Sequence, residues 1–427
     1  MATTHRWISG AAAVAQVQDY LFGGTWEATD IVLATIGNVQ VSLGAVGSTV
    51  ITTLIDTLVV AYNALDVNLY PQFAEMTASR SGNNFRLTGD TEGYPFVLTL
   101  STTETGGGAA DAQTIDGAAS SAGTETTVCQ GPNHWNCAAN WSDNTLPADT
   151  DTTVMENNSD DILYGLSQTG IDLAACTINP SYTGNIGLPK QNSNGYAEYR
   201  TDNLMLGTVT ALTIKGGKRK KINVGSNACS VLVNDNGTSP EPGVPAFLFL
   251  GTSASNTMTV LKGSVGVAFY AGETSDLSGG LRLGLVANKE SDANVYCGSG
   301  VTLATVTKDG GVLETNSAIT TLVNNEGETK HQAGAMTNLT ATGGILRYNS
   351  TSALGTPIIS GSFLLDFDQD PRAKTVTNPI DVYGDKARVR DTYKVVASLV
   401  VDYNYAEVQV NGESLGTNVR FTRGTPA

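Results

Sequence analysis

The sequence has little of what enzymes of mixed α/β type usually contain. Only 15% of its 427 residues are charged and 7% are aromatic. Such enzymes bury amphipathic helices rich in Lys, Glu and Leu, and here a single segment has good helical periodicity. Glycine is abundant instead, with 47 residues, and Thr, Ser, Asn and Val recur throughout. This composition is typical of an extended all-β structural protein, and the length is ample for two or three domains.

Positive charge and long apolar runs are also scarce. The formal net charge is −16 and the isoelectric point is near 4.5, whereas a general nucleic-acid binder needs a positive field. No run reaches the roughly eighteen apolar residues of a membrane-spanning helix. The small-residue run at 10–15 is too short and too weakly apolar for a signal-peptide core. We therefore expect no membrane partner, no specific nucleic-acid partner, and maturation in a cytoplasm.

Cysteine and histidine, which supply many zinc sites and catalytic triads, are few and scattered. The odd number of cysteines without CxxC spacing indicates buried free thiols rather than a disulfide or metal framework. Only one pair is plausible, and whether it forms stays open: Cys129 and Cys137. The three histidines lack HxxxH or HxH spacing: His5, His134 and His331. We expect no metal site, no histidine-based triad and no cofactor.

A short phrase recurs in the second half of the chain. An apolar strand position returns at spacings of 19, 17 and 19 residues: Leu303, Leu322, Leu339 and Ile358. After three of these positions a small-residue corner leads to a second apolar strand, which includes Val312, Ile345 and Phe363. A repeat this short cannot close a core alone and must stack on its neighbours. The pattern predicts a parallel β-solenoid, most simply a right-handed β-helix, with the four positions stacked in one core. A β-sandwich with hairpins is the alternative.

The chain divides by composition into five parts. Residues 1–102 form a small α+β attachment domain, in which Ser48 caps a helix from Thr49 to about Ala64. Residues 103–127 are rich in Gly, Ala, Ser and Thr and are interpreted as a linker. The remaining parts are the cap and start of the solenoid, the β-helix and a C-terminal β segment: 128–200, 201–390 and 391–427.

Two clusters in the solenoid are candidates for binding. Trp135 and Trp141 fit a plug for the open solenoid end, with stacking on a carbohydrate as the alternative. A basic run could contact an acidic partner or nucleic acid, with a solvated loop as the alternative. The run comprises Lys215, Lys218, Arg219, Lys220 and Lys221.

The best candidate for catalysis is the acidic segment at 366–372. Strand alternation would place three carboxylates on one face beside Arg372, as in β-helix lyases and glycosidases: Asp366, Asp368 and Asp370. The alternative is that the strand leaves the solenoid and its acids face water or hold Ca²⁺. An EF-hand-like loop is not matched, since Pro371 and Thr377 replace its Gly and Glu. We interpret the chain as a non-enzyme, with no catalytic residue assigned.

Several phrases resemble uncharacterised structural proteins of tailed bacteriophages and prophages. They are the opening His5 to Val17, Gly23 to Trp26, the helix end Ala61 to Ala64, Phe73 to Phe96, Asn140 to Pro147 and Leu415 to Arg420. The resemblance covers most of the chain and carries no catalytic motif. It implies a virion component, such as a head-decoration, fibre or tail-associated protein, made in the host cytoplasm. It also implies contacts with capsid or tail proteins and a homo-oligomer, commonly a trimer.

The N-terminal arm is the candidate docking element. Arg and Trp dominate the energetics of many interfaces, and the arm contains His5, Arg6 and Trp7. Packing of Trp7 on its own domain is the alternative. Two other functions stay open: a tailspike-like polysaccharide depolymerase, and a cell-surface adhesin or filament subunit.

Overall fold

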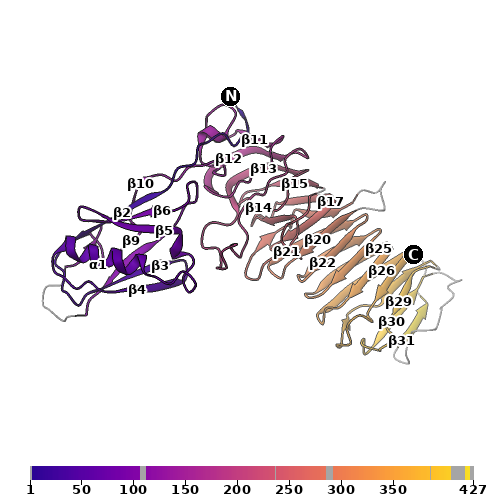
Figure 1. Cartoon of the computed structure of the whole chain (residues 1–427). Helices are drawn as coiled ribbons and strands as arrows, with labels where there is room; N and C mark the ends of the chain where they lie inside the picture. Colours follow the sequence, from indigo (N-terminus) through magenta and orange to yellow (C-terminus); the bar gives the residue numbers. More distant parts are fainter. Residues whose placement is uncertain are drawn as a thin grey trace.

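The computed structural model describes residues 2–105, 112–235, 237–284, 292–384, 386–404 and 419–423. A small domain of antiparallel sheets lies at one end, and a long parallel β-helix extends away from it (Figure 1). The predicted mainly β fold with a parallel solenoid is confirmed, and the β-sandwich alternative is wrong, because the large sheet pairs in parallel. No helix in the described ranges is long and apolar enough to cross a membrane.

The β-helix strands in chain order are β1 (Thr4–Arg6), β11 (Thr152–Met155), β12 (Ser167–Ile178), β13 (Leu204–Ile214), β14 (Lys220–Asn223), β15 (Ser230–Asn234), β16 (Phe247–Leu250), β17 (Thr257–Val267), β18 (Ser275–Asp276), β19 (Gly280–Leu283), β20 (Ala293–Cys297), β21 (Val301–Lys308), β22 (Val312–Thr315), β23 (Ile319–Asn324), β24 (Glu328–His331), β25 (Met336–Tyr348), β26 (Ala353–Asp366), β27 (Thr375–Val376), β28 (Ile380–Tyr383), β29 (Arg388–Arg390), β30 (Leu399–Tyr403) and β31 (Val419–Arg423).

The small domain contains β2 (Val17–Gly23), β3 (Ile31–Ile36), β4 (Val39–Ala45), α1 (Ile51–Asn63), the 3₁₀ helix η1 (Phe73–Glu75), β5 (Met76–Ser81), β6 (Asn84–Gly89), β7 (Thr99–Thr103), β8 (Thr114–Ile115), β9 (Ser120–Ser121) and β10 (Thr124–Thr127). A second 3₁₀ helix, η2 (Ala138–Asn140), follows it. The domain has two sheets, in the orders β10-β2-β6-β5, with β8 also on β2, and β4-β3-β7-β9.

Each turn of the β-helix stacks short parallel runs on the runs of the next turn. One column of buried side chains contains Leu281, Val306, Leu322 and Leu339. A second contains Val295, Leu313, Thr329, Leu346 and Leu365. A third contains Leu303, Ile319, Met336 and Leu354. Each column is closed only by neighbouring turns, so no turn has a core of its own.

The predicted register of the repeat is correct at two positions and wrong at two. Leu322 and Leu339 are direct partners, as expected. Leu303 lies three residues before Val306 in the same strand, β21, and pairs with Ile319 instead of Leu322. Ile358 pairs with Thr340 and is half-exposed. Successive side chains of a strand point to opposite faces, so a shift of one residue moves a side chain out of the core.

The small domain is an insertion near the start of the β-helix. β1 pairs in parallel with β11, so the N-terminal arm is itself a solenoid strand. The chain leaves at Val14 and returns at Gln130, where the Val14 N–H donates to the Gln130 carbonyl at 2.8 Å. The predicted domain at 1–102 therefore wrongly includes the arm, because the partner of the arm lies far along the chain. Parallel pairing also extends beyond the predicted β-helix limits of 201 and 390, from β1 to β31.

The predicted linker at 103–127 is wrong where it is described. β8 and β10 pair with β2, and β9 pairs with β7, so this segment completes the sheets of the small domain. Short edge strands need few large apolar side chains, which explains the linker-like composition. Residues 106–111 of this segment lie outside the described residues. So do residues 405–418 and 424–427 of the C-terminal segment, with most of the phrase from Leu415 to Arg420.

The single predicted helix is confirmed as α1, which packs on β4, β5 and β6. Its buried residues are Leu54, Ile55, Leu58 and Tyr62. The expected cap is wrong, because the helix begins after Val50, which makes no side-chain capping bond. The Ser48 hydroxyl accepts a bond from the Val50 N–H at 3.0 Å, in the turn before the helix.

Candidate functional site

The tryptophans of the predicted cap are buried at the first end of the β-helix. Trp141 packs edge-on against Trp7 and Trp135, with ring centroids 5.3 and 4.8 Å apart. The Trp141 indole N–H donates to the Trp135 carbonyl at 3.0 Å. All three side chains are at most 1% exposed. Their faces are therefore occupied by one another and do not present a stacking platform for a carbohydrate.

The arm that was the candidate docking element is mostly used within the chain. His5 is 2% exposed and lies between Asp143 at 3.1 Å and Asp151 at 2.9 Å. Arg6 is 51% exposed and pairs with Glu156. Trp7 is buried, but it packs on Trp141 in the core of the β-helix and not on the predicted domain at 1–102. Arg6 is the exposed part of the arm. Docking of the arm on another protein stays a prediction.

An arginine from the β-helix joins the two parts of the molecule. Arg200 lies in the loop between β12 and β13, and its side chain is 5% exposed. It donates to Glu198 at 2.7 Å and reaches Glu75 of the small domain at 3.5 Å. Burial alone would raise the pKa of Glu198, but the bonds from Arg200 lower it below its usual value. A buried arginine held by two carboxylates resists separation of the parts, because a lone buried charge is costly.

Aromatic side chains extend this junction, which we call the Arg200 clamp (Glu75, Tyr196, Glu198, Tyr199 and Arg200). The Tyr199 hydroxyl donates to Glu75 at 2.9 Å, and its ring packs on the core of the small domain. Gly37, in the tight β3–β4 turn, has a φ of +58°, and a Cβ there would lie 3.0 Å from the Tyr199 Cβ. The turn can approach Tyr199 this closely because residue 37 is glycine.

A cleft of about 270 Å³ lies beside the Arg200 clamp. Its lining includes Pro95, Val97, Tyr164 and Arg200. The charge of Arg200 is already neutralised by carboxylates. Burial raises the pKa of the Tyr164 hydroxyl, so this hydroxyl stays protonated. The described lining has no carboxylate pair and no histidine, so it offers no general acid and base of the kind that hydrolysis needs.

The predicted basic contact patch is largely internal. Lys220 is fully buried and pairs with Asp235, which is 1% exposed. Arg219 and Lys221 are 5% and 3% exposed, and they pair with Glu241 at 2.7 Å and Asp202 at 3.1 Å. Of the predicted residues, Lys218 is exposed and Lys215 half-buried. A five-residue basic surface therefore does not form, because acids distant in sequence meet three of its members.

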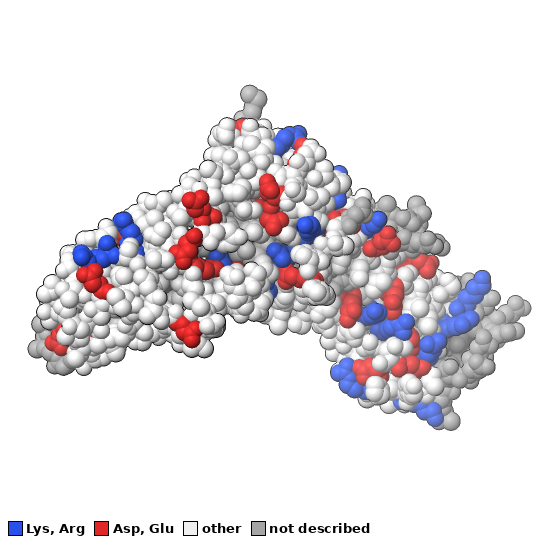
Figure 2. Space-filling model, in the orientation of Figure 1, with Lys and Arg blue, Asp and Glu red and all other residues white. Residues whose placement is uncertain are grey.

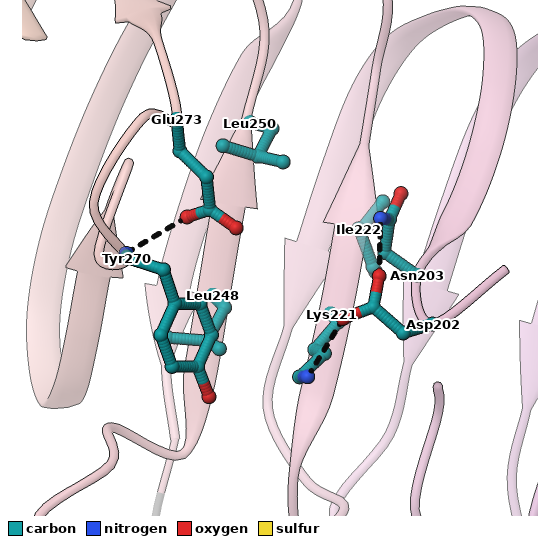
Figure 3. Close-up of a pocket in the computed structure, with 8 residues that line it drawn as sticks. All are labelled: Asp202, Asn203, Lys221, Ile222, Leu248, Leu250, Tyr270 and Glu273. Atoms are coloured by element: carbon teal, nitrogen blue, oxygen red, sulfur yellow. Dashed lines mark hydrogen bonds and ion pairs between the residues drawn. The ribbon is translucent and has the colours of Figure 1, made fainter. Parts of the chain in front are cut away.

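A small pocket lies beside the Asp202–Lys221 pair (Figure 3). Asp202 and Lys221 face each other on one side, while Tyr270 and Glu273 lie on the other. The Tyr270 ring is approached by the ammonium groups of Lys190 at 4.9 Å and Lys221 at 5.2 Å. The volume is about 10 Å³, which suits roughly one water molecule. The arrangement cross-links neighbouring turns and is too small for a ligand.

The acidic segment does not form the expected strand face. β26 ends at Asp366, which is 1% exposed and lies 3.5 Å from Arg390 and 3.8 Å from Arg347. Asp368 accepts a bond from the Thr392 N–H at 2.7 Å, and Asp370 pairs with Arg372. Pairing with Arg372 lowers the pKa of Asp370 to about 2. The three acids therefore make separate contacts and do not share one face.

One cysteine lies beside a histidine, the pairing that activates nucleophilic thiols. Cys129 Sγ is 3.7 Å from His134 Nε2, and both residues are buried. Burial raises the pKa of the Cys129 thiol to about 11 and lowers that of His134. The pair is therefore neutral, whereas a catalytic thiolate needs a depressed pKa. Cys129 and Cys137 do not form a disulfide, and all five cysteines are free and buried, as predicted.

Three acids of the small domain meet in an arrangement that the sequence patterns missed. Glu27, Asp30 and Glu104 place carboxylate oxygens within 4.8 Å of one another. Burial and then the neighbouring Glu104 carboxylate raise the pKa of Asp30, although a bond from the Glu27 backbone opposes the rise. Glu104 is far from the other two in sequence. The sequence alone therefore shows only two acids three residues apart, Glu27 and Asp30, and not the group of three.

Charged side chains are sparse on the face shown in Figure 2. Toward the C-terminal end of this view, acidic and basic residues lie beside one another rather than in separate fields. No protein-family model, no curated protein and no solved structure matches the chain.

Proposed function

We propose that this protein is a non-enzymatic structural component of a bacteriophage virion, in which the β-helix acts as a rigid spacer for the small domain. The observation that carries the proposal is the way the two parts are joined. The small domain is inserted between β1 and β11, and the Arg200 clamp holds it on the first end of the β-helix. A connection through two chain crossings and a buried ion-paired cluster fixes the orientation of the domain.

Two further features support this proposal. The end of the β-helix beside the small domain is plugged by the chain's own tryptophans and arm, which protects it from end-to-end stacking. The sequence phrases described above resemble structural proteins of tailed phages and prophages. Attachment through the small domain, with the β-helix projecting outward or joining identical copies, is the assembly that we propose.

The test is mass spectrometry with copy counting on particles from the phage or induced prophage that encodes this chain. We expect the chain in purified particles at a fixed copy number. A variant with residues 15–129 replaced by a short Gly/Ser linker keeps the arm, because Val14 and Gln130 are already bonded. This variant should fold as a β-helix and be lost from the particles.

Three outcomes would contradict parts of the proposal. Particles without the chain would refute a virion role. Incorporation of the excised variant at normal copy number would place the docking surface on the β-helix. Cleavage of host capsule by the full chain, lost when Asp366 and Asp368 are changed to Asn, would assign a polysaccharide depolymerase instead.

A further inference from the structure

The three acids of the small domain are brought together by strand pairing. β3 and β7 are antiparallel neighbours, and Ile31 lies opposite Thr103. The residues just outside this pair, Asp30 and Glu104, therefore lie at the same end of the sheet. Glu27 begins the turn that leads into β3. The Asp30 N–H donates to the Glu27 carbonyl at 3.2 Å, and this bond closes the turn.

Asp30 is the central member of this group. Its side chain is 0% exposed. One carboxylate oxygen, Oδ2, accepts a bond from the Glu27 N–H at 2.8 Å. The other, Oδ1, is buried and accepts no hydrogen bond of good geometry from the described residues. Buried polar atoms in folded proteins are nearly always paired, so this oxygen calls for a partner.

A cation is a partner that would satisfy this oxygen and offset the negative charge of the group. Carboxylate oxygens from Glu27 and Glu104 lie within 4.8 Å of those of Asp30, so a neutral donor would leave the repulsion between the acids in place. A cation between the oxygens would satisfy Oδ1 and offset the charge of all three groups. Glu27 and Glu104 are half-buried, which leaves a route for an ion and its water ligands.

We propose that Glu27, Asp30 and Glu104 form a binding site for a divalent cation, with Ca²⁺ as the ion that fits best. The three side chains offer only oxygen ligands, which exclude the nitrogen and sulfur sets that zinc and copper prefer. Ca²⁺ accepts six to eight oxygens in flexible geometry, so three carboxylates can be completed by water. Mg²⁺ demands a stricter octahedron, which a turn and a strand end do not provide.

The bound ion would hold the connection between β2 and β3 against the end of β7. The turn from Glu27 to Asp30 follows β2 of one sheet, whereas Glu104 follows β7 of the other. Trp26, directly before Glu27, stacks on Phe22 with ring centroids 5.2 Å apart. A cation at this position would stabilise the closed end of the domain core.

The test uses the full chain with calcium or a chelator. Calcium up to about 1 mM, the weak end of protein calcium sites, should raise the melting temperature of the small domain in a saturable way. Asp30→Asn should remove this rise, and Glu104→Gln should weaken it. Glu92→Gln changes an exposed carboxylate of the same domain and should keep the full rise.

A second measurement locates the ion. Terbium, which binds calcium sites, luminesces when a nearby tryptophan is excited, and Trp26 adjoins the site. We expect one terbium per chain, displaced by calcium, with the signal lost in Asp30→Asn at unchanged circular dichroism. Equal melting temperatures with calcium and chelator, or a calcium effect that survives Asp30→Asn, would overturn the inference.

Discussion

The two parts of the molecule stabilise themselves in different ways. The small domain has a closed antiparallel core with large aromatic side chains, among them Tyr20, Phe22, Trp26 and Phe85. The β-helix has stacked columns that are mostly aliphatic, and it also buries lysines: Lys220, Lys308 and Lys374. No lysine occurs in the sequence before Lys190. Buried lysines are therefore a feature of the solenoid alone.

The corners of the solenoid explain why lysine is tolerated there. Lys220 Nζ donates to the Gly216 and Gly217 carbonyls at 2.9 and 3.2 Å. Lys308 Nζ donates to the Glu326 carbonyl at 2.7 Å, and Lys374 Nζ donates to two carbonyls in its own corner. Corners between strands leave backbone carbonyls without a ladder partner, and an ammonium group can satisfy more than one of them. An antiparallel domain closed by tight hairpins has fewer such corners.

The largest effect should come from breaking the Lys220–Asp235 pair. Asp235→Asn leaves a buried ammonium without its counter-ion, and we expect a loss of about 3–5 kcal/mol in the free energy of unfolding of the β-helix. The matched control is Asp56→Asn in the small domain, which releases an exposed pair with Arg80. That change should cost at most about 1 kcal/mol. Denaturant unfolding of each variant measures both, and similar losses would contradict the contrast between the two parts.

A smaller effect is expected at the Arg200 clamp. Arg200→Met removes charge-assisted bonds worth about 1.5–3 kcal/mol, and the small domain should then unfold separately from the β-helix in calorimetry. Arg86→Met is the control, because Arg86 pairs with Asp19 inside the small domain at 2.7 Å. It should weaken that domain without uncoupling it. A single transition in Arg200→Met would show that other contacts hold the parts together.

A third effect, smaller per pH unit than either of these losses, is a pH dependence that belongs to the β-helix. Burial lowers the pKa of Lys308 from 10.5 to about 7. Between these values the unfolded chain holds a proton that the folded chain lacks, so stability rises with pH. The slope from this residue is at most about 1.4 kcal/mol per pH unit. Lys308→Met should flatten the curve of unfolding free energy between pH 7 and about 10, and an unchanged slope would contradict the assignment.

The tryptophans and the basic run show where sequence reasoning succeeded and failed. Large aromatic residues outside the repeat predicted a plug, and Trp135 and Trp141 are buried together with Trp7, which directly follows the first strand of the β-helix. The basic run looked like a surface because its members are adjacent in sequence. Its acids are not adjacent: Asp235 follows Lys220 by 15 residues and Asp202 precedes Lys221 by 19. Ion pairs between neighbouring turns of the β-helix cannot be inferred until the number of residues in each turn is known.

The sequence by itself determined the parallel β-helix and the one amphipathic helix. Leu322 and Leu339 recur with the period of a turn, and α1 repeats its apolar side chains with the period of a helix. Such patterns are visible locally, because burial of one face imposes a period on the chain.

Only the tertiary structure decided which distant segments meet. The insertion of the small domain depends on the pairing of β1 with β11. These two strands are separated by more than a hundred residues in the sequence. The Arg200–Glu75 contact spans 125 residues, and the Glu27–Asp30–Glu104 group forms where the start of β3 lies beside the end of β7. These contacts leave no periodic trace in the sequence, because each is made once and its geometry is set by the packing of whole elements.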